Sequence, residues 1–175
     1  MSMWSVRRAV LADAPGMARV SVASWRAAYA GIMRAETLAA LSIEERAQHW
    51  RERLADPASS AAFALVAEQM GAIGGFASLG PVRDPDLDPA RVGELWAIYV
   101  DPMVWGKGAG PALWTLALDE LRARRFETLV LWVLTANARA RRFYEKQGMT
   151  LDGGEKSPVE DGAPLPHLRY RMGLS

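Results

Sequence analysis

The residues with the clearest chemical potential are three glycines at alternate positions, Gly106, Gly108 and Gly110, within VWGKGAGPAL (Val104–Leu113). Glycine at this spacing weakens a helix or a strand, because it loses more backbone entropy on folding than any other residue. At a strand-to-helix junction, however, bare backbone leaves amide N–H groups at the positive end of the helix dipole, where phosphates bind. The segment therefore predicts either a phosphate or pyrophosphate site or a tight turn that only permits close strand–helix packing.

Two nucleotide-binding motifs fit this segment poorly. A Walker A loop requires Gly-Lys-Ser/Thr, but Lys107 is followed by Gly108, so no hydroxyl is available for magnesium. A Rossmann fingerprint requires G-x-G-x-x-G, whereas this segment reads G-x-G-x-G and continues with Pro111. A nucleotide-binding α/β domain stays as a rival interpretation, which predicts stabilisation by ATP or NAD.

The elements that must position this turn are two flanking apolar runs and the segment between them. Gly93–Val100 (GELWAIYV) precedes the turn, and Glu127–Leu134 (ETLVLWVL) is apolar enough for a strand covered on both faces. Pro111–Arg125 has its leucines on one stripe and arginines in its last turn, which predicts an amphipathic helix. A strand, a helix and a strand in this order form a βαβ unit, so the two strands are expected to be parallel.

The rest of the chain is expected to complete a single domain over residues 1–175, because the length suits one core and no repeat or long linker divides it. Pro81–Arg91 is polar, contains three prolines and is expected to be a loop. The other expected elements are strands at Trp4–Val10, Ala61–Ala67, Ala72–Gly80, Met149–Gly153 and His167–Leu174, and helices from Asp13 to Gly31, from Ser42 to before Pro57, and over Ala138–Gln147.

Composition excludes several classes of site. The net charge of +1 gives no attraction to nucleic acid or to an anionic membrane. The absence of cysteine excludes disulfides, thiolate metal sites and a cysteine nucleophile, and His49 and His167 lack metal-ligand spacing. No apolar run approaches the ~20 residues of a membrane helix, and the start of the chain has no signal-like apolar region, so we expect a cytoplasmic protein.

Three segments together resemble the GNAT acetyltransferase superfamily. Trp105-Gly-Lys-Gly108-Ala-Gly110 is similar to its [Q/R]-x-x-G-x-[G/A] loop at two of the three defining positions, and departs at Trp105. Tyr99–Pro102 (YVDP) resembles the strand end that precedes this loop in the family. Asn137–Met149 closely resembles the second family hallmark, N-x₅-[FY]-Y-x-x-x-G-[FM].

The resemblance implies an α/β fold of GNAT type, a mixed and mostly antiparallel central sheet with parallel, splayed central strands flanked by helices. Acetyl-CoA is the implied cofactor, with its pantetheine arm paired to Ile98 and Val100 as a substitute strand. Asn137 would hydrogen-bond the pantetheine amide, or cap the helix that follows it, or do both. The cofactor-binding residues implied in this way are Ile98, Tyr99, Val100, Gly106, Lys107, Gly108, Ala109, Gly110, Asn137 and Tyr144.

The implied activity is an N-acetyltransferase that moves an acetyl group to a primary amine by direct attack. No residue resembles a covalent nucleophile. The acceptor stays open between small-molecule amines and peptide or protein amines, with no nucleic acid or membrane partner, and the oligomeric state stays open, a homodimer included. The alternative is a non-catalytic acyl-CoA-binding sensor with a GNAT-like fold, which the departures at Trp105 and Pro111 favour.

Proton transfer sets the demand for catalytic residues. A lysine-like amine with a pKa near 10.4 is neutral in about one molecule in 2,500 at pH 7, so its deprotonation costs roughly 4.6 kcal/mol. Deprotonation of an α-amine with a pKa near 8 costs only about 1.4 kcal/mol. Glu94 is the candidate base acting through water, and alternation predicts that it shares a strand face with Trp96 and Ile98. Its other interpretation is an edge carboxylate in solvent. Tyr144 matches the family's usual general acid for the thiolate, or is an aromatic packed beneath the cofactor.

The acceptor pocket is harder to predict. Trp25 and Tyr29, four residues apart on one helix, are candidates for its wall together with Glu94, and they fit a helix core equally well. The aspartates at 84, 86 and 88 resemble the start of a calcium loop that lacks its glycine and its closing glutamate, so a solvated loop is favoured, with attraction of a cationic amine as the lesser alternative. The arginines at 139, 141 and 142 could meet the adenine end of the cofactor or form a solvated face.

Overall fold

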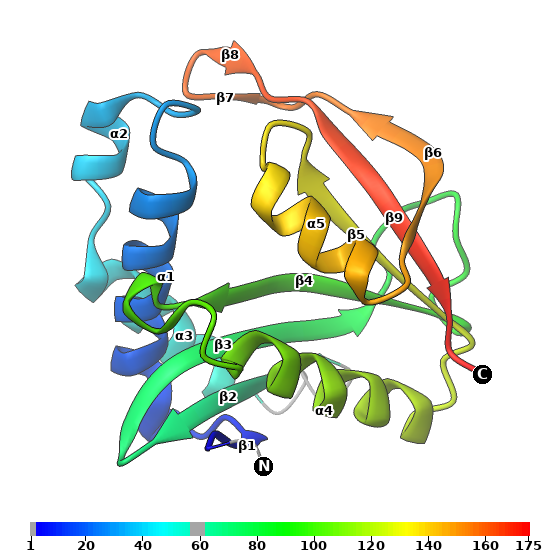
Figure 1. Cartoon of the computed structure of the whole chain (residues 1–175), viewed down its shortest axis with the longest axis horizontal. Helices are drawn as coiled ribbons and strands as arrows, with labels where there is room; N and C mark the ends of the chain where they lie inside the picture. Colours follow the sequence, from blue (N-terminus) through cyan, green and yellow to red (C-terminus); the bar gives the residue numbers. More distant parts are fainter. Residues whose placement is uncertain (1–2, 57–61) are drawn as a thin grey trace.

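The computed structural model describes residues 3–56 and 62–175, which form one large sheet with helices on both faces (Figure 1). Seven strands follow the order β1-β2-β3-β4-β5-β9-β6, and a separate hairpin pairs β7 with β8. The strands are β1 (Ser5–Arg8), β2 (Phe63–Gln69), β3 (Ala72–Pro81), β4 (Val92–Val100), β5 (Thr128–Leu134), β6 (Thr150–Lys156), β7 (Val159–Glu160), β8 (Ala163–Pro164) and β9 (His167–Gly173). The helices are α1 (Ala14–Ala28), α2 (Ala35–Ala39), α3 (Ile43–Ala55), α4 (Ala109–Ala123) and α5 (Ala138–Lys146).

All neighbouring strands of the large sheet are antiparallel except β4 and β5, which run parallel and are connected by α4. This arrangement confirms the predicted fold class and the predicted βαβ unit. The parallel pairing joins Val92–Leu95 to Thr128–Leu131, although both strands continue beyond it. The carboxyl ends of β4 and β5 therefore separate. The space between them, beyond residues 95 and 131, is called the gap below.

A β-bulge in β4 lies where the gap begins. Two consecutive residues of β3 pair with Leu95 and Ala97, so Trp96 is an extra residue that shifts the side-chain alternation by one position. Leu95 and Ile98 consequently pack on the same face of the sheet, together with α4. Ala97 and Tyr99 pack on the opposite face, with α1 and α3.

The prediction that Glu94 shares a strand face with both Trp96 and Ile98 is therefore wrong for Ile98. Strict alternation assumes an uninterrupted strand, and the bulge breaks that assumption. Glu94 and Trp96 both contact Arg83, whose guanidinium carbon lies 4.7 Å from the Trp96 ring centroid.

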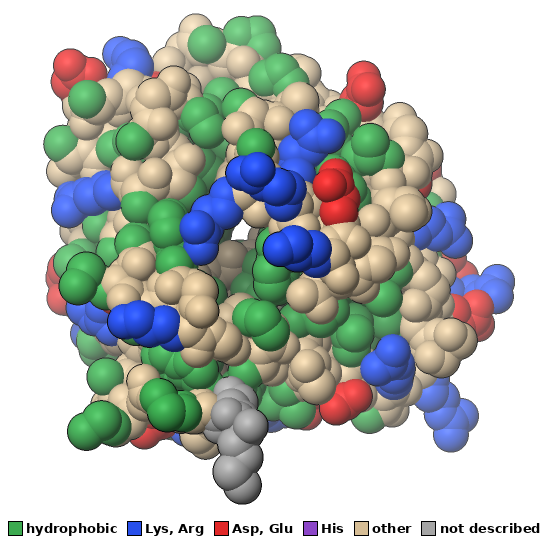
Figure 2. Space-filling view, viewed as in Figure 1, with side chains coloured by type: hydrophobic (Ala, Val, Ile, Leu, Met, Phe, Trp, Pro, Cys, Tyr) green, Lys and Arg blue, Asp and Glu red, His purple; other side chains and the backbone are tan. Residues whose placement is uncertain are grey.

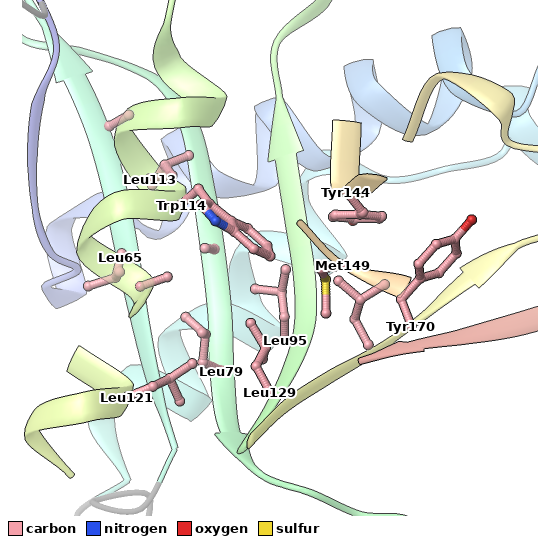
Figure 3. Close-up of a cluster of buried hydrophobic side chains, with 14 of the residues drawn as sticks. Leu65, Leu79, Leu95, Leu113, Trp114, Leu121, Leu129, Tyr144, Met149 and Tyr170 are labelled. Carbon is pink, nitrogen blue, oxygen red and sulfur yellow. The ribbon is translucent and has the colours of Figure 1, made fainter. Parts of the chain in front are cut away.

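Two clusters of buried side chains cover the two faces of the sheet. On one face, Leu113, Trp114 and Leu121 of α4 point toward leucines of β2, β3 and β4 (Figure 3). At the end of this cluster lie Tyr144 of α5 and Tyr170 of β9 (Figure 3). On the other face, α1 and α3 pack against β2 and β3. The sheet is thus held from both sides, and β4 carries side chains into each cluster.

Several elements differ from the sequence-based expectation. The helix after the glycines begins at Ala109 instead of Pro111, because glycine at the N-cap allows the chain to enter the helix earlier. The first helix ends at Ala28, before Gly31, and the first strand is shorter than expected. The helix α2 and the β7–β8 hairpin were not expected, since both are too short to give a periodic pattern. Ala61, the expected start of β2, lies outside the described residues.

Candidate active site

The glycine turn, residues 106–110, connects the end of β4 to α4. Gly106 and Gly108 have φ angles of +75° and +93°, in the left-handed region that only glycine adopts at low cost. Gly108 is the N-cap of α4, and its carbonyl accepts from the N–H of Ala112. The amides of Gly108, Ala109 and Gly110 precede this hydrogen bond, so the helix itself supplies no acceptor for them. They form the positive end of the α4 dipole.

Side chains hold the turn in place from both sides. The indole N–H of Trp4 donates to the carbonyl of Lys107 at 2.9 Å, and the Lys107 ammonium donates to the carbonyl of Met103 at 3.1 Å. A Cβ on Gly110 would lie 3.5 Å from the Phe143 ring of α5, so α5 approaches the turn closely. Pro111 is the third residue of α4, a position that has no intrahelical acceptor for an N–H.

Backbone groups of β4 face the gap. The N–H of Asp101 donates to the carbonyl of Gly74 in β3 at 2.8 Å. Because backbone groups alternate along a strand, Tyr99 also directs its N–H and C=O toward β3, whereas Ile98 and Val100 direct theirs away from β3. Tyr99 can therefore meet a cofactor in the gap only through its side chain, whereas Ile98 and Val100 offer main-chain donors and acceptors.

Trp105, the residue that departs from the family motif, already contacts one of these groups. Its indole N–H donates to the carbonyl of Val100 at 2.8 Å. The guanidinium carbon of Arg139 in α5 lies 3.8 Å from the Trp105 ring centroid, a cation–π contact. Trp105 thus braces the end of β4 against α5 across the gap, and it leaves the N–H of Val100 and both groups of Ile98 facing the gap.

Tyr144 lies on the α5 side of the gap. Its ring is buried and packs against the rings of Trp114, Phe143 and Tyr170, with centroids 5.6 to 6.4 Å apart. Burial raises the pKa of the Tyr144 phenol well above its usual value, and the neighbouring Tyr99 adds to the rise. Tyr144 is therefore protonated throughout the physiological range. Its hydroxyl has no hydrogen-bond partner among the described residues.

Asn137 caps α5, as one of its two sequence interpretations predicted. Its side-chain oxygen accepts from the N–H of Ala140 at 3.1 Å. The side-chain amide nitrogen has no acceptor in the described part of the chain and keeps two donors. The cap and a contact to a cofactor amide are thus compatible.

Glu94 is buried, with 3% of its surface exposed, and Arg83 binds it. The Arg83 backbone N–H donates to one carboxylate oxygen at 2.9 Å, and the guanidinium donates to both oxygens at 2.9 and 3.3 Å. The Arg83 side chain is 62% exposed. A water molecule that accepts or delivers a proton at Glu94 must therefore share this carboxylate with Arg83.

Trp25 and Tyr29, the candidates for the acceptor wall, stack edge-on with ring centroids 4.8 Å apart. Burial raises the pKa of the Tyr29 phenol, and its neighbours Tyr99, Tyr144 and Glu160 add to the rise. Burial also raises the pKa of Tyr99. The structure thus brings Trp25, Tyr29, Tyr99 and Tyr144 together from α1, β4 and α5. The first three of these, with Arg46 of α3, are called the acceptor wall below, after the role proposed for them.

Basic side chains surround a hollow in the surface above the end of β4 and beside α5 (Figure 2). Of the three arginines expected there, Arg139 contacts Trp105, and Arg141 donates to the Tyr170 hydroxyl at 3.1 Å and to the carbonyl of Thr135 at 3.2 Å. Arg142 is exposed. Arg141 is thus a structural residue, and Arg139 and Arg142 stay candidates for an anionic end of the cofactor.

The expectation of a solvated acidic loop is wrong for Asp84, whose side chain is 16% exposed, and holds for the exposed Asp86, although both form ion pairs. Arg169 of β9 binds both at about 3.0 Å, and it also binds Asp152 at 2.7 Å. Asp84 additionally accepts from the indole N–H of Trp132 at 2.9 Å. Asp84 and Asp86 thus hold the β3–β4 loop to β9. Because both are paired with Arg169, they are not free to attract a cationic substrate. The sequence gives no signal for Arg169, because its partners are 17 to 85 residues away.

A second set of contacts that the sequence did not indicate joins the β7–β8 hairpin to the start of α2. It is called the Asp161 latch below. Asp161, at the turn of the hairpin, accepts from the Arg34 backbone N–H at 2.7 Å, from its guanidinium at 2.8 Å, and from the Thr37 hydroxyl. These contacts lower the pKa of Asp161, the guanidinium contributing most. The hairpin also carries Glu160, whose charge contributes to the raised pKa of the Tyr29 and Tyr99 phenols.

A separate cavity of about 630 Å³ lies between the end of α1 and α2 and is lined by small and apolar residues such as Met33 and Leu38. None of its lining residues belongs to the glycine turn, the gap or the acceptor wall. In the described part of the chain, no group of His, Cys, Asp or Glu side chains could hold a metal ion. No helix within residues 3–56 and 62–175 has the length and apolarity that a membrane crossing requires.

Comparisons with known proteins agree with this arrangement. The sequence profile of the acetyltransferase (GNAT) family matches residues 24–149. The uncharacterized N-acetyltransferase YuaI of Bacillus subtilis is 33% identical over 135 residues, which span 77% of this chain and 74% of that protein. The chain belongs to the GNAT acetyltransferase family.

Two further similar proteins are a solved acetyltransferase with its cofactor and a longer acetyltransferase that this chain matches only in part. YncA of Salmonella typhimurium, solved with its cofactor acetyl-CoA, superposes with a TM-score of 0.73 at 25% identity, over 98% of this chain and 94% of YncA. The mycothiol acetyltransferase of Beutenbergia cavernae is 48% identical over 61 residues, 35% of this chain but only 20% of that longer protein. The chain is an N-acetyltransferase that uses acetyl-CoA.

The residues present fit this cofactor. The glycine turn offers amides without helical acceptors, which suit a diphosphate. The gap exposes backbone groups of Ile98 and Val100, which suit the amides of an extended arm. Both features were expected from the GNAT motifs. Arg46 and the Asp161 latch lie outside those motifs, and only the three-dimensional structure brings them near the site.

Proposed function

We propose that this GNAT protein transfers the acetyl group of acetyl-CoA to a primary amine by direct attack. The observation that carries the proposal is the gap, where β4 and β5 part after residues 95 and 131 beside the glycine turn. Acetyl-CoA supplies an activated acetyl thioester. The chain contains no cysteine, and no serine is paired with a histidine by motif, so an acetyl-enzyme step has no evident nucleophile.

In this proposal the two ends of the cofactor are held by backbone. The amides of Gly108, Ala109 and Gly110 bind the diphosphate, and Ile98 and Val100 pair with the pantetheine arm. A gap-facing N–H of β4 is suited to donate to the thioester carbonyl and to stabilise negative charge that develops on its oxygen. Asn137 donates to a pantetheine carbonyl from its free side-chain amide while it caps α5.

Tyr144 is the proposed proton donor to the departing thiolate. A free phenol near pKa 10 is a weaker acid than a thiol near 8.5, so full transfer is uphill by about 2 kcal/mol in water. Burial raises the pKa of Tyr144 further, and it also disfavours a bare thiolate in the same surroundings. Tyr144 therefore acts mainly by hydrogen-bonding the leaving sulfur, which makes it helpful but not indispensable.

Glu94 is retained as the proposed base, with Arg83 as its partner. The exposed Arg83 guanidinium can move and admit a water molecule to the carboxylate, whereas Glu94 itself is fixed. The demand for this base depends on the acceptor, because a lysine-like amine is far less often neutral at pH 7 than an α-amine.

The test of the proposed function combines cofactor binding with turnover. Coenzyme A is expected to raise the melting temperature, because a ligand of the native state stabilises it. Acetyl-CoA with a panel of primary amines is expected to release free thiol in an amine-dependent manner. Binding without release across the panel would instead favour the sensor alternative. No shift in melting temperature at saturating coenzyme would contradict the cofactor site itself.

The expectations of a cytoplasmic location and of a homodimer as one candidate state stay predictions. Cell fractionation and size-exclusion chromatography of the full chain test them.

A further inference from the structure

α3 contributes to the acceptor wall an arginine whose role the fold does not explain. The guanidinium carbon of Arg46 lies 4.6 Å from the ring centroid of Trp25. Its Nη1 donates a hydrogen bond of 2.7 Å to the hydroxyl of Ser21. Among the described residues, Arg46 has no carboxylate partner and no other hydrogen-bond acceptor. Since a guanidinium carries five N–H donors, most of its hydrogen-bonding capacity is unused.

Arg46 is also partly withdrawn from water. It is half-buried, and burial lowers the pKa of its guanidinium, an effect that the phenols of Tyr99 and Tyr29 partly offset. Taking a charge out of water is costly unless an opposite charge and hydrogen bonds compensate. The Ser21 hydroxyl and the Trp25 ring supply only part of that compensation.

The most buried arginine among the described residues is paired with carboxylates. Arg169, with a side chain only 10% exposed, binds Asp84, Asp86 and Asp152. The contrast with Arg46 is one of position: Arg169 of β9 holds the β3–β4 loop, whereas Arg46 of α3 lies over the Trp25 ring of α1. Arg46 has no carboxylate partner among the described residues, so it is suited to bind a negatively charged group of the substrate.

The β7–β8 hairpin, which Asp161 holds to Arg34 and Thr37, carries a side chain of the opposite charge. Glu160 of the β7–β8 hairpin is exposed and has no ion-pair partner in the described part of the chain, and its charge acts on Tyr29 and Tyr99. The charge of Arg46 acts on Tyr99 as well. The phenols of Tyr29 and Tyr99 are thus within the electrostatic influence of a cation, Arg46, and of an anion, Glu160. The buried indole N–H of Trp25 is directed toward the Tyr99 hydroxyl but forms no hydrogen bond of good geometry within the described residues.

We propose that Arg46 binds a carboxylate of the acceptor, so that the substrate is an amine that also carries a carboxylate, as an amino acid does. The inference deepens the proposed function and rests on it. Arg46 forms a bidentate ion pair with the carboxylate, and the exposed Glu160 attracts the ammonium group. Arg46 is a specificity-determining residue and takes no part in the proton transfers.

The experiment compares acceptors that differ only in the carboxylate. Thiol release is measured with the common amino acids, with their amides and with the corresponding decarboxylated amines. Because these amines differ in pKa, each rate is compared at equal concentrations of the neutral amine. For the preferred side chain, the wild-type kcat/KM is expected to be at least about tenfold higher with the free carboxylate, because one charged hydrogen-bonded pair is at stake.

Arg46→Gln is expected to remove this preference by raising the KM for the carboxylated acceptor about 10- to 100-fold, while kcat/KM for the decarboxylated amine changes little. Arg46→Lys should restore part of the preference, since lysine keeps the positive charge but cannot donate two parallel hydrogen bonds to a carboxylate. Arg51→Gln on the same helix, whose partner Glu44 is exposed, is the matched control and should behave as wild type.

Each outcome decides a different point. Equal rates with carboxylated and decarboxylated acceptors, or an Arg46→Gln variant that loses activity toward both alike, would overturn the role of Arg46 while the acetyltransferase function stands. Coenzyme binding without any amine-dependent thiol release would overturn the proposed function and this inference with it. A coenzyme-induced shift in melting temperature that equals the wild-type shift verifies that Arg46→Gln is folded.

Discussion

The two sides of the gap are built from different material. On the cofactor side, the glycine turn and the end of β4 offer backbone groups, and their geometry depends on glycine, on a helix terminus and on strand separation. On the side proposed for the acceptor, the acceptor wall and the β7–β8 hairpin offer side chains of opposite charge near aromatic rings. A backbone site restricts which residues can form it, whereas a side-chain site can be rebuilt residue by residue. From this difference we expect that one set of substitutions changes the affinity for the cofactor and that a separate set changes the affinity for the acceptor.

The largest effect is expected from Gly108→Val, which should weaken coenzyme A binding by roughly 100-fold. A φ of +93° costs a side chain about 1–2 kcal/mol, and a β-branched one more, so the turn must change shape and misdirect its amides. Isothermal titration calorimetry measures the affinity. Gly153→Val is the matched control, because Gly153 has a φ of +90° in β6, away from the turn. Equal affinity losses in both variants would mean that general destabilisation, not the turn, is responsible.

Tyr144→Phe should lower kcat about 10- to 100-fold and leave the KM for acetyl-CoA nearly unchanged, because it removes one proton donor and keeps the ring packing. Since burial holds the pKa of Tyr144 above its usual value, the wild-type rate should not decline through ionisation of this residue between pH 7 and about 10.

Tyr170→Phe is the control for Tyr144→Phe. Tyr170 is buried too, but its hydroxyl donates to Glu145 and accepts from Arg141. The control should therefore lose stability and retain kcat. Unchanged turnover in Tyr144→Phe would remove Tyr144 from the mechanism.

Glu94→Gln should lower kcat/KM at pH 7 about tenfold for a high-pKa amine and much less for an amine near pKa 8, because only the first depends strongly on a base. The difference should shrink as the pH approaches the pKa of the amine. Arg83→Gln, which removes the other half of the ion pair, should retain turnover. If both variants lost kcat/KM equally for both amines, Glu94 would have only a structural role as the partner of Arg83.

The smallest effect is expected from Asp161→Asn, which loosens the hairpin and should raise the acceptor KM a few-fold without changing coenzyme affinity. The folded-state pKa of Asp161 is lowered, so its ion pair contributes stability above the unfolded pKa near 3.9 and loses it as the pH falls through the lower folded value. The difference in melting temperature between wild type and Asp161→Asn should therefore shrink below about pH 4. Asp119→Asn, at an exposed pair on α4, is the control.

The same division explains what the sequence could predict. Glycine spacing, the apolar runs and the cap at Asn137 are local patterns, and they predicted the turn, the parallel strands and α5 at nearly their observed positions. The bulge at Trp96 has no local pattern, so the alternation argument placed Ile98 on the wrong face. The partners of Arg169 come from elements distant in sequence, which no periodicity encodes.

The central claim is that the gap and the glycine turn together hold acetyl-CoA. A crystal structure of the full chain with coenzyme A tests it most directly. The expected result is a diphosphate on the amides of Gly108, Ala109 and Gly110, with the pantetheine arm paired to Ile98 and Val100 between β4 and β5. Coenzyme bound elsewhere, with the gap closed by side chains, would contradict the account.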